Sequence, residues 1–569
     1  MIAGAHASHQ LRRPWGLHAG LLLVAIAILF AATAAEWDLG VLFDRSERAH
    51  ALARMGEWLS AFASPDFSTL FLSQAWELTQ QTLAAAIIGS LLAVLFGFLL
   101  ALGATRSVTV PAEASGWRAR LSPLALFCAL CRLLQDVLRA VPDFVWAVIL
   151  VALIGLGPAT GALAIALNMS GILAKVYSEL WDSVEARASE PVRATGAGRL
   201  ATFFYCVRPL AARNTLSFTL MRFECAVRNA AVIGAVGGGG LGAEVLYQIQ
   251  FGAWDKVSTL ILFTLLLTLS VDLASNALRR QWREDPNHPR AGGVSRAIGR
   301  SYVGLAGVLA AGGWALAFMG ERLLPLWELV SGEAWGKLAF FERLLRPDLS
   351  ADLLLRALGS AIDPLAMAVF GTFFGVLGAV VLGYTHSYAF QAEPQRFTGE
   401  AVGPAIRSVR LSLLVLTRIL ALVCRGIPEV MWVLLFIAFF GPGLLAGTLA
   451  IGLHSMGLLL RVFSESVDNQ PYRRFEQGFM GSRLTLFATV AAPVSARDWL
   501  TYGFFQFESN VRMAVVLGLV GVGGLGFQFS FHFEWFRFEQ ASTYLLVMIG
   551  LTVAIDRLSR WLKLSRVGC

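Results

Sequence analysis

The sequence predicts an all-α polytopic membrane protein with about 12 transmembrane helices, arranged as two parallel six-helix repeats. Composition is the first reason, because hydrophobic residues make up 56% of the chain and charged residues only 15%. Ordinary soluble domains have about 25% charged residues. Apolar windows of roughly 20 residues, enough to cross a bilayer, recur along the chain. Finally, segments of the first half return in the second half at offsets of 282 to 286 residues.

The first half is expected to cross the membrane six times. The approximate spans are 17–36, 80–104, 141–157, 160–181, 207–236 and 256–278. The first apolar run, Leu17–Ala35, follows basic residues as a signal peptide does. This run is too long for a signal peptide, so we interpret it as an uncleaved anchor.

Basic residues predict which side each loop faces. Arg12 and Arg13 precede the first span, and six arginines lie within 279–300, as expected for cytoplasmic segments. Six spans return the linker to the cytoplasm, so the halves are parallel and both termini are cytoplasmic. This distribution explains the net charge of +8 better than nucleic-acid binding does. The six cysteines lack metal-ligand spacing, and no metal site is expected.

The segment 122–140, just before the third span, is charged. It contains Arg132, Asp136 and Arg139 and ends before Pro142. Three charges fit a membrane interface better than hydrocarbon, which predicts an amphipathic helix at the cytoplasmic surface.

The repeat is clear in the third and fourth spans. RAVPDFVWAVILVALIGLG (Arg139–Gly157) returns as RGIPEVMWVLLFIAFFGPG (Arg425–Gly443), and the fourth span returns with His454 in place of Asn168. A single intramembrane histidine is more often a hydrogen-bonded packing residue than a proton carrier. The predicted units are a first repeat at 1–285, a basic cytoplasmic linker at 286–300 and a second repeat at 301–569.

A polar cytoplasmic loop, 178–211, separates the fourth and fifth spans. Glu190–Thr195 favours a short helix that Gly196 ends. Such a helix is either a docking element for a partner protein or a solvated connector.

The fifth span holds the most unusual motif. FECAVRNAAVIGAVGGGGLG (Phe223–Gly242) returns as FESNVRMAVVLGLVGVGGLG (Phe507–Gly526), identical at 13 of 20 positions. Glu and Arg four residues apart share a helix face, and intramembrane charges usually face a bundle interior or an aqueous cavity. Each pair either neutralises itself and fixes packing, or holds an Arg that meets an anion. The glycines permit close helix contact or line a cavity.

Several motifs together resemble a known family. EPVRATGAGRL followed by RPLA resembles the coupling loop of binding-protein-dependent ABC importer permeases. RAVPDFVWA, the glycine-rich stretch and VDLASNALRR are similar to the permease of phosphonate ABC importers, over most of spans two to six in both halves. The resemblance implies two fused type I ABC-importer permease repeats in one chain. Their coupling loops would lie near 182–200 and 468–484.

Candidate site residues follow from the resemblance and from the charges of the fifth span. Those expected to contact an ATPase are Glu190, Arg193, Gly196 and Arg199 in the first half and Glu476, Gly481 and Arg483 in the second, where the pattern is weaker. Those expected to line the substrate pathway are Glu224, Arg228, Asn229, Glu508 and Arg512. Arginine suits phosphonate oxygens because its planar fork can bond two of them.

The expected function is the transmembrane permease subunit of an ATP-driven importer for phosphonate, phosphite or phosphate. The chain has no GxxxxGK[ST] loop, so ATP and Mg are expected on two cytoplasmic ATP-binding subunits, and no cofactor on this chain. An extracytoplasmic binding protein would deliver substrate to the inner membrane. Alternatives are an ABC permease for another small solute, an ion-coupled secondary transporter and, with less support, a channel.

Overall fold

The structure is a computed structural model that describes residues 25–26, 28–35, 37, 43–109, 122–281, 293–332, 339–392, 403–469 and 482–567. Regular structure within these ranges is helical, which confirms the all-α prediction. Seven helices are long and apolar enough to cross a membrane, or up to 11 if each of four bent pairs counts as one span. Half of the first expected span, namely 17–24, 27 and 36, lies outside the described residues.

The first half contains eleven labelled helices in the described ranges. They are α3 (Arg45–Phe62), α4 (Thr69–Ala104), α5 (Arg106–Thr109), α7 (Pro123–Ala140), α8 (Asp143–Ile154), α9 (Pro158–Asp182), α10 (Ala186–Ala194), α11 (Arg199–Thr202), α12 (Arg208–Ile233), α13 (Leu241–Gln250) and α14 (Trp254–Gln281).

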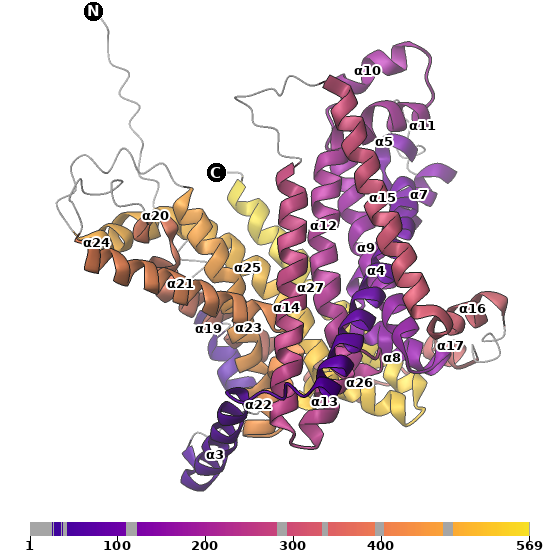
Figure 1. Ribbon diagram of the computed structural model, residues 1–569. Coiled ribbons are helices and arrows are strands. Elements are labelled where there is room, and N and C mark those ends of the chain that lie inside the picture. The colour runs from indigo at the N-terminus through magenta and orange to yellow at the C-terminus, as the bar shows by residue number, and fades with distance from the viewer. Residues whose placement is uncertain are drawn as a thin grey trace, which may run out of the picture.

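The described part of the second half repeats this order. It comprises α15 (Gly293–Met319), α16 (Leu324–Ser331), α17 (Ala339–Leu344), α18 (Ala351–Gly359), α19 (Ile362–His386), α20 (Tyr388–Gln391), α21 (Pro404–Gly426), α22 (Glu429–Phe440), α23 (Leu444–Asp468), α24 (Arg483–Leu486), α25 (Ala492–Leu517), α26 (Gly524–Glu534) and α27 (Phe538–Val567). In Figure 1, α10 lies at one end of the molecule together with the ends of α14 and α27, and α13, α22 and α26 lie at the other.

Proline bends the chain at the start of the third expected span of each half. The pairs α7–α8 and α21–α22 each turn by 91°. The turns lie at Pro142 and Pro428, and a residue before proline leaves the helical region, as Val141 does at φ −78° and ψ 118°. The sharp turn separates an outer-facing helix from a short helix that enters the interface between the halves.

Two of the charges of α7, the helix expected at the membrane surface, pair with another helix. Arg132 pairs with Asp182 of α9 at 3.0 Å, and Asp136 pairs with Lys175 of the same helix at 2.9 Å. Leucines and Phe127 occupy the exposed face instead. The amphipathic pattern of α7 therefore also reflects pairing of its polar face with α9.

Glycines allow the chain to bend tightly at the end of the fifth span. The bends are 44° between α12 and α13 and 54° between α25 and α26. A Cβ atom at Gly242 would lie 2.0 Å from the Ala231 carbonyl oxygen, and Gly526 stands equally close to Val515. Gly237 has φ of +107°, which disfavours other residues. At these positions the glycines serve close backbone packing.

The halves exchange their first spans. The second half's α15 lies along α4 of the first half (Figure 1), where Ala315 and Met319 join one buried cluster with Ala84 and Ile88. In the reverse direction, Trp37 of the first half stacks edge-on against Phe370 of α19, with ring centroids 5.1 Å apart. Each half therefore contributes to the core of the other.

Candidate functional site

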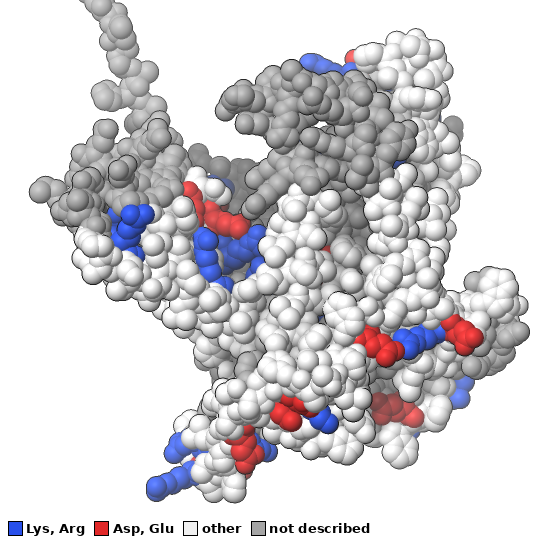
Figure 2. Space-filling view, viewed as in Figure 1, with Lys and Arg blue, Asp and Glu red and all other residues white. Residues whose placement is uncertain are grey.

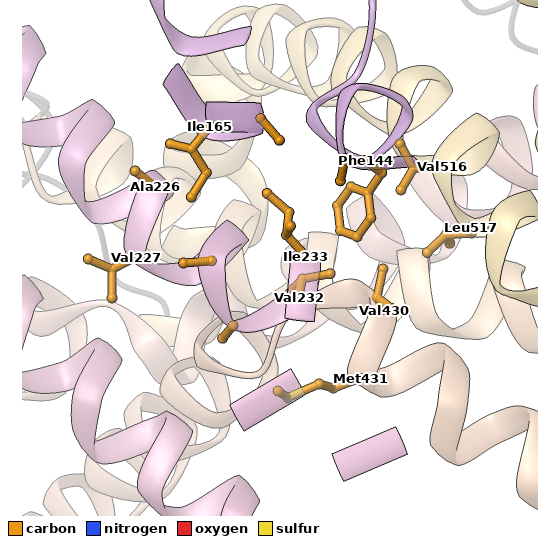
Figure 3. Close-up of a cluster of buried hydrophobic side chains, with 14 of the residues drawn as sticks. Phe144, Ile165, Ala226, Val227, Val232, Ile233, Val430, Met431, Val516 and Leu517 are labelled. Carbon is orange, nitrogen blue, oxygen red and sulfur yellow. The ribbon is translucent and has the colours of Figure 1, made fainter. Parts of the chain in front are cut away.

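An apolar layer joins the two halves at the centre of the molecule. Figure 3 shows Phe144 of α8 near Val430 of α22, together with the C-terminal ends of α12 and α25. The equivalent pairs are Phe144 and Val430, Val232 and Val516, and Ile233 and Leu517, all at most 3% exposed. These side chains close the interface between the halves near the glycine turns.

Charged side chains lie on the coupling-helix side of this layer, and their pairing in the first half differs from the prediction. Glu224 bonds Arg279 of α14 and not Arg228. Arg228 forms no ion pair with a described residue, and its Nε is buried without a hydrogen bond. Sequence spacing could not reveal this, because Arg279 reaches Glu224 from another helix. The predicted direct pair is wrong here, although Arg228 lies within electrostatic range of Glu224.

An ion pair crosses between the halves beside Arg228. Arg425 of α21 contacts Asp272 of α14 at 3.2 Å, with side chains 16% and 7% exposed. Arg228 and Glu224 both lie within electrostatic range of Arg425. Arg461 also lies within electrostatic range of Arg425, and it contacts Glu465 at 2.9 Å. With Arg279, the described cluster therefore has four guanidinium groups and three carboxylates. It carries one positive charge in excess.

The second half keeps the pair that its sequence predicts. Arg512 contacts Glu508 at 3.2 Å, and their side chains are 27% and 10% exposed. Arg512 also lies within electrostatic range of Arg139 and Arg222, both in the first half. Positive charges from both halves thus act on this side of the interface too.

Neutral polar groups hold the bends in place. Asn168 donates to the Val141 carbonyl at 2.8 Å, and His454 contacts the equivalent carbonyl of Ile427 at 3.2 Å. His454 also contacts Glu429 at 3.1 Å, as a hydrogen-bonded packing residue would. Asn229 donates to Asp143 at 2.5 Å, so its amide is engaged with the N-terminus of α8.

The second half also contains a buried polar network that sequence reasoning missed. Asn510 donates to Thr372 and Ser455 at 2.8 and 2.9 Å, and Gln506 donates to Asn510 at 2.9 Å. The sequence feature that could have predicted this network is the presence of two amides, Gln506 and Asn510, four residues apart in an apolar span. The first half has Arg222 and Ala226 at these positions.

The predicted coupling residues fall into two groups. Glu190, Arg193 and Gly196 are exposed on or just after α10, and Gly196 has φ of +81°. Arg199 instead donates to the Thr109 carbonyl at 3.3 Å, and Arg483 donates to the Phe390 carbonyl at 3.0 Å. Each arginine fastens its loop to the short helix after the second span, α5 in the first half and α20 in the second. Glu476 and Gly481 lie outside the described residues.

Two aspartates that were not among the predicted site residues form further hydrogen bonds to the short helices α5 and α20. Asp182 accepts from the backbone of Arg106 and Ser107, and Asp468 accepts from the backbone of Tyr388 and Ala389. They tie the fourth span to the short helices α5 and α20.

The space-filling view locates the charged groups that are visible from outside. Figure 2 shows acidic and basic side chains gathered where the surface is hollowed between α21 and α14. A separate cavity of about 850 Å³ lies between α18, α19 and α27 of the second half, lined by Arg356, Asp363 and Arg537 among others. The Glu224 and Glu508 clusters are not part of its lining.

Comparison with known proteins identifies similar chains. Residues 121–284 match the family described as binding-protein-dependent transport system inner membrane component. The chain is 28% identical over 490 residues to the phosphate-import permease protein PhnE of Mycolicibacterium smegmatis, covering 85% of this chain and 84% of the relative. It is 27% identical over 281 residues to the phosphite transport system permease protein PtxC of Stutzerimonas stutzeri, covering 49% and 96%.

A third relative is the candidate phosphite permease HtxC of Stutzerimonas stutzeri. It is 31% identical over 230 residues, which cover 40% of this chain and 76% of the relative. No solved structure matches.

Proposed function

Because the chain belongs to the binding-protein-dependent transport system inner membrane components, we propose that it forms the whole membrane domain of an ATP-driven importer for phosphonate or a related phosphorus oxyanion, such as phosphite or phosphate. The observation that carries this proposal is the similarity to phosphate and phosphite permeases. PtxC has about half the length of this chain, since 96% of it aligns with 49% of this chain. One chain would therefore supply both halves that single-unit permeases supply as two.

The charges between the halves support an anionic substrate. Arg228 lacks an ion pair among the described side chains, and its cluster has one more guanidinium than carboxylate. A guanidinium can bond two oxygens of a tetrahedral oxyanion at once. Arg228 and Arg512 would receive the anion. Glu224 and Glu508 would offset the other positive charges of the pathway. Asn229 would orient Asp143 beside the pathway.

Energy would come from partner proteins. Two cytoplasmic ATP-binding subunits, with ATP and Mg, would dock on α10 and on the matching loop of the second half. Glu190, Arg193 and Gly196 would form the contact surface, and Arg199 and Arg483 would transmit the push to the second spans. Glu476 and Gly481 would act in the second loop. An extracytoplasmic binding protein would dock at the α13 and α26 end, with both termini in the cytoplasm.

The test is ATP-dependent uptake in proteoliposomes containing the complete complex with its ATP-binding subunits and binding protein. Methylphosphonate, phosphite and phosphate are compared with sulfate. We expect at least one phosphorus oxyanion to stimulate ATP hydrolysis and to accumulate, and sulfate to do neither. Stimulation by an unrelated solute alone would assign the permease another substrate. Uptake driven by an ion gradient without ATP would indicate a secondary transporter.

A further inference from the structure

The cavity of about 850 Å³ in the second half has no part in the pathway proposed above. It lies between α18, α19 and α27 and is also lined by α26, at the end of the molecule opposite α10 (Figure 1). Small-molecule sites typically have volumes of about 300–1,000 Å³ and mostly apolar walls. This cavity has such a volume, but more than half of its lining residues have polar side chains. It therefore suits a polar ligand.

The charged side chains of the lining favour an anion that also carries a hydroxyl group. Arg356 is already paired with Asp352 at 2.6 Å, whereas no described carboxylate forms an ion pair with Arg537. The backbone N–H of Arg537 donates to the His532 carbonyl at 2.9 Å, which holds this residue at the cavity. Asp363 is the one carboxylate of the lining, and a carboxylate can accept from a hydroxyl.

A buried tyrosine supplies a second donor. Tyr544 of α27 is 3% exposed and lines the cavity, and its hydroxyl forms no hydrogen bond with a described residue. Its ring stacks on His532, with centroids 5.2 Å apart and planes 16° apart, which fixes the direction of the hydroxyl. Buried tyrosine hydroxyls usually have a hydrogen-bond partner. A ligand in the cavity would provide one.

The first half does not repeat this arrangement. Leu260 and Ala253 stand at the positions of Tyr544 and Arg537, at an offset of 284. At the corresponding place in the described first half, the gap beside Gln81 has no room for a water molecule. The cavity and its donors are therefore particular to the second half and do not follow from the repeated architecture alone.

Exposed aromatic side chains precede Arg537. Trp535 and Phe536 are 65% and 72% exposed. Phe536 has φ of +57°, a conformation that costs a bulky residue more than it costs the equivalent Gly252. Tryptophan is enriched at the level of lipid headgroups. Arg537 thus lies where a headgroup as well as a free solute can reach it.

We propose that this cavity binds an anion containing a phosphate group, with Arg537 and Tyr544 donating to its oxygens. A guanidinium can donate two hydrogen bonds to one tetrahedral oxyanion. Two sources share this chemistry, namely free hydrogen phosphate and the headgroup of phosphatidylglycerol, and both carry hydroxyls. The inference goes beyond the proposed function, because the Glu224 and Glu508 clusters are not part of the lining. The site would exist whichever solute is transported.

The test is isothermal titration calorimetry on the purified full-length chain in a neutral detergent. One arm uses inorganic phosphate, and the other uses soluble dihexanoyl phosphatidylglycerol. We expect saturable binding of at least one, which identifies the source. Arg537→Gln should raise the dissociation constant about tenfold or more, and Tyr544→Phe about threefold or more. The control is Arg346→Gln, because Arg346 is exposed, pairs with Glu342 and lies outside the lining.

A cavity-filling variant leaves every charge in place. A Cβ atom at Gly359, a lining residue, would have open space around it, so Gly359→Trp should express normally and lose binding. Labelling of the unmodified chain needs no variant. Phenylglyoxal modifies accessible arginines, and the bound ligand should protect Arg537 but not Arg346, as read by mass spectrometry.

Three results would overturn the inference. They are absence of saturable binding in both arms, affinities of Arg537→Gln and Tyr544→Phe within twofold of the unmodified chain, and labelling of Arg537 that neither ligand changes. Binding that Arg228→Gln abolishes and Arg537→Gln leaves intact would place the anion in the pathway between the halves. That result would support the proposed function and reject this site. Conversely, a complex that transports no phosphorus oxyanion but binds a phosphate group through Arg537 would retain the site and reject the proposed substrate.

Discussion

Replacing Asp272 with Asn is expected to weaken the contact between the two halves of the membrane domain. Asp272 is 7% exposed on its side chain and stands 3.2 Å from Arg425 of the other half. At that separation, two unit charges attract each other by about 5 kcal/mol at an effective dielectric constant of about 20. Removing one partner of a buried pair costs roughly 3–5 kcal/mol, because the other charge is left unpaired. We therefore expect Asp272→Asn to lower the free energy of unfolding by about 3 kcal/mol or more.

The assay is denaturant unfolding of the detergent-solubilised chain, followed by tryptophan fluorescence. The matched control is Asp352→Asn, since Asp352 pairs with Arg356 at 2.6 Å but both side chains are at least 70% exposed. Exposed helix pairs contribute about 0.3–0.5 kcal/mol. Combining Asp272→Asn with Arg425→Gln should restore most of the lost stability. If Asp272→Asn costs no more than Asp352→Asn, or if the Asp272 and Arg425 effects add without coupling, the reasoning about this inter-half pair is refuted.

Three further outcomes are expected. Native mass measurement of the solubilised complex should find one copy of this chain with two ATP-binding subunits, and two copies of the chain would contradict the fused arrangement. Glu190→Ala should uncouple ATP hydrolysis from uptake more than Glu476→Ala, because only the first loop has the full docking pattern. Equal losses would show that the sequence difference between the two loops does not affect coupling. Gly242→Ala should abolish stable expression, because its Cβ would lie 2.0 Å from a backbone oxygen, whereas Gly313→Ala, which has open space, should express normally; similar yields would contradict the tight turn.

Much of the fold could be predicted from the sequence because apolar length and repetition are local properties of the chain. The polar face of α7 shows what such patterns miss. Its three charges suit a membrane surface by composition, yet Lys175 and Asp182 of α9 pair with two of them. A partner from another helix cannot be read from spacing along one helix.

The candidate site shows the same limit more strongly. Spacing correctly paired Glu508 with Arg512, but the identical spacing failed for Glu224, which bonds Arg279 at a separation of 55 residues. Arg222 drew no attention, because a single arginine in a span resembles many packing residues. Its difference from Gln506, which bonds Ser455 and Asn510 at the equivalent position, appears only when the two halves are compared.

The exchange of first spans has a consequence for how such a chain can evolve. A single-unit ancestor with this arrangement would pair with an identical copy, so any substitution would appear twice around the interface. Once two units are joined in one polypeptide, each mutation appears once, and the two sides can diverge. Because α15 lies on the first half and Trp37 on the second, each unit packs against the other. After that divergence, neither unit can pair with a copy of itself as the ancestor did. Once the units are joined and have diverged, the two different halves therefore have to be kept together in one polypeptide.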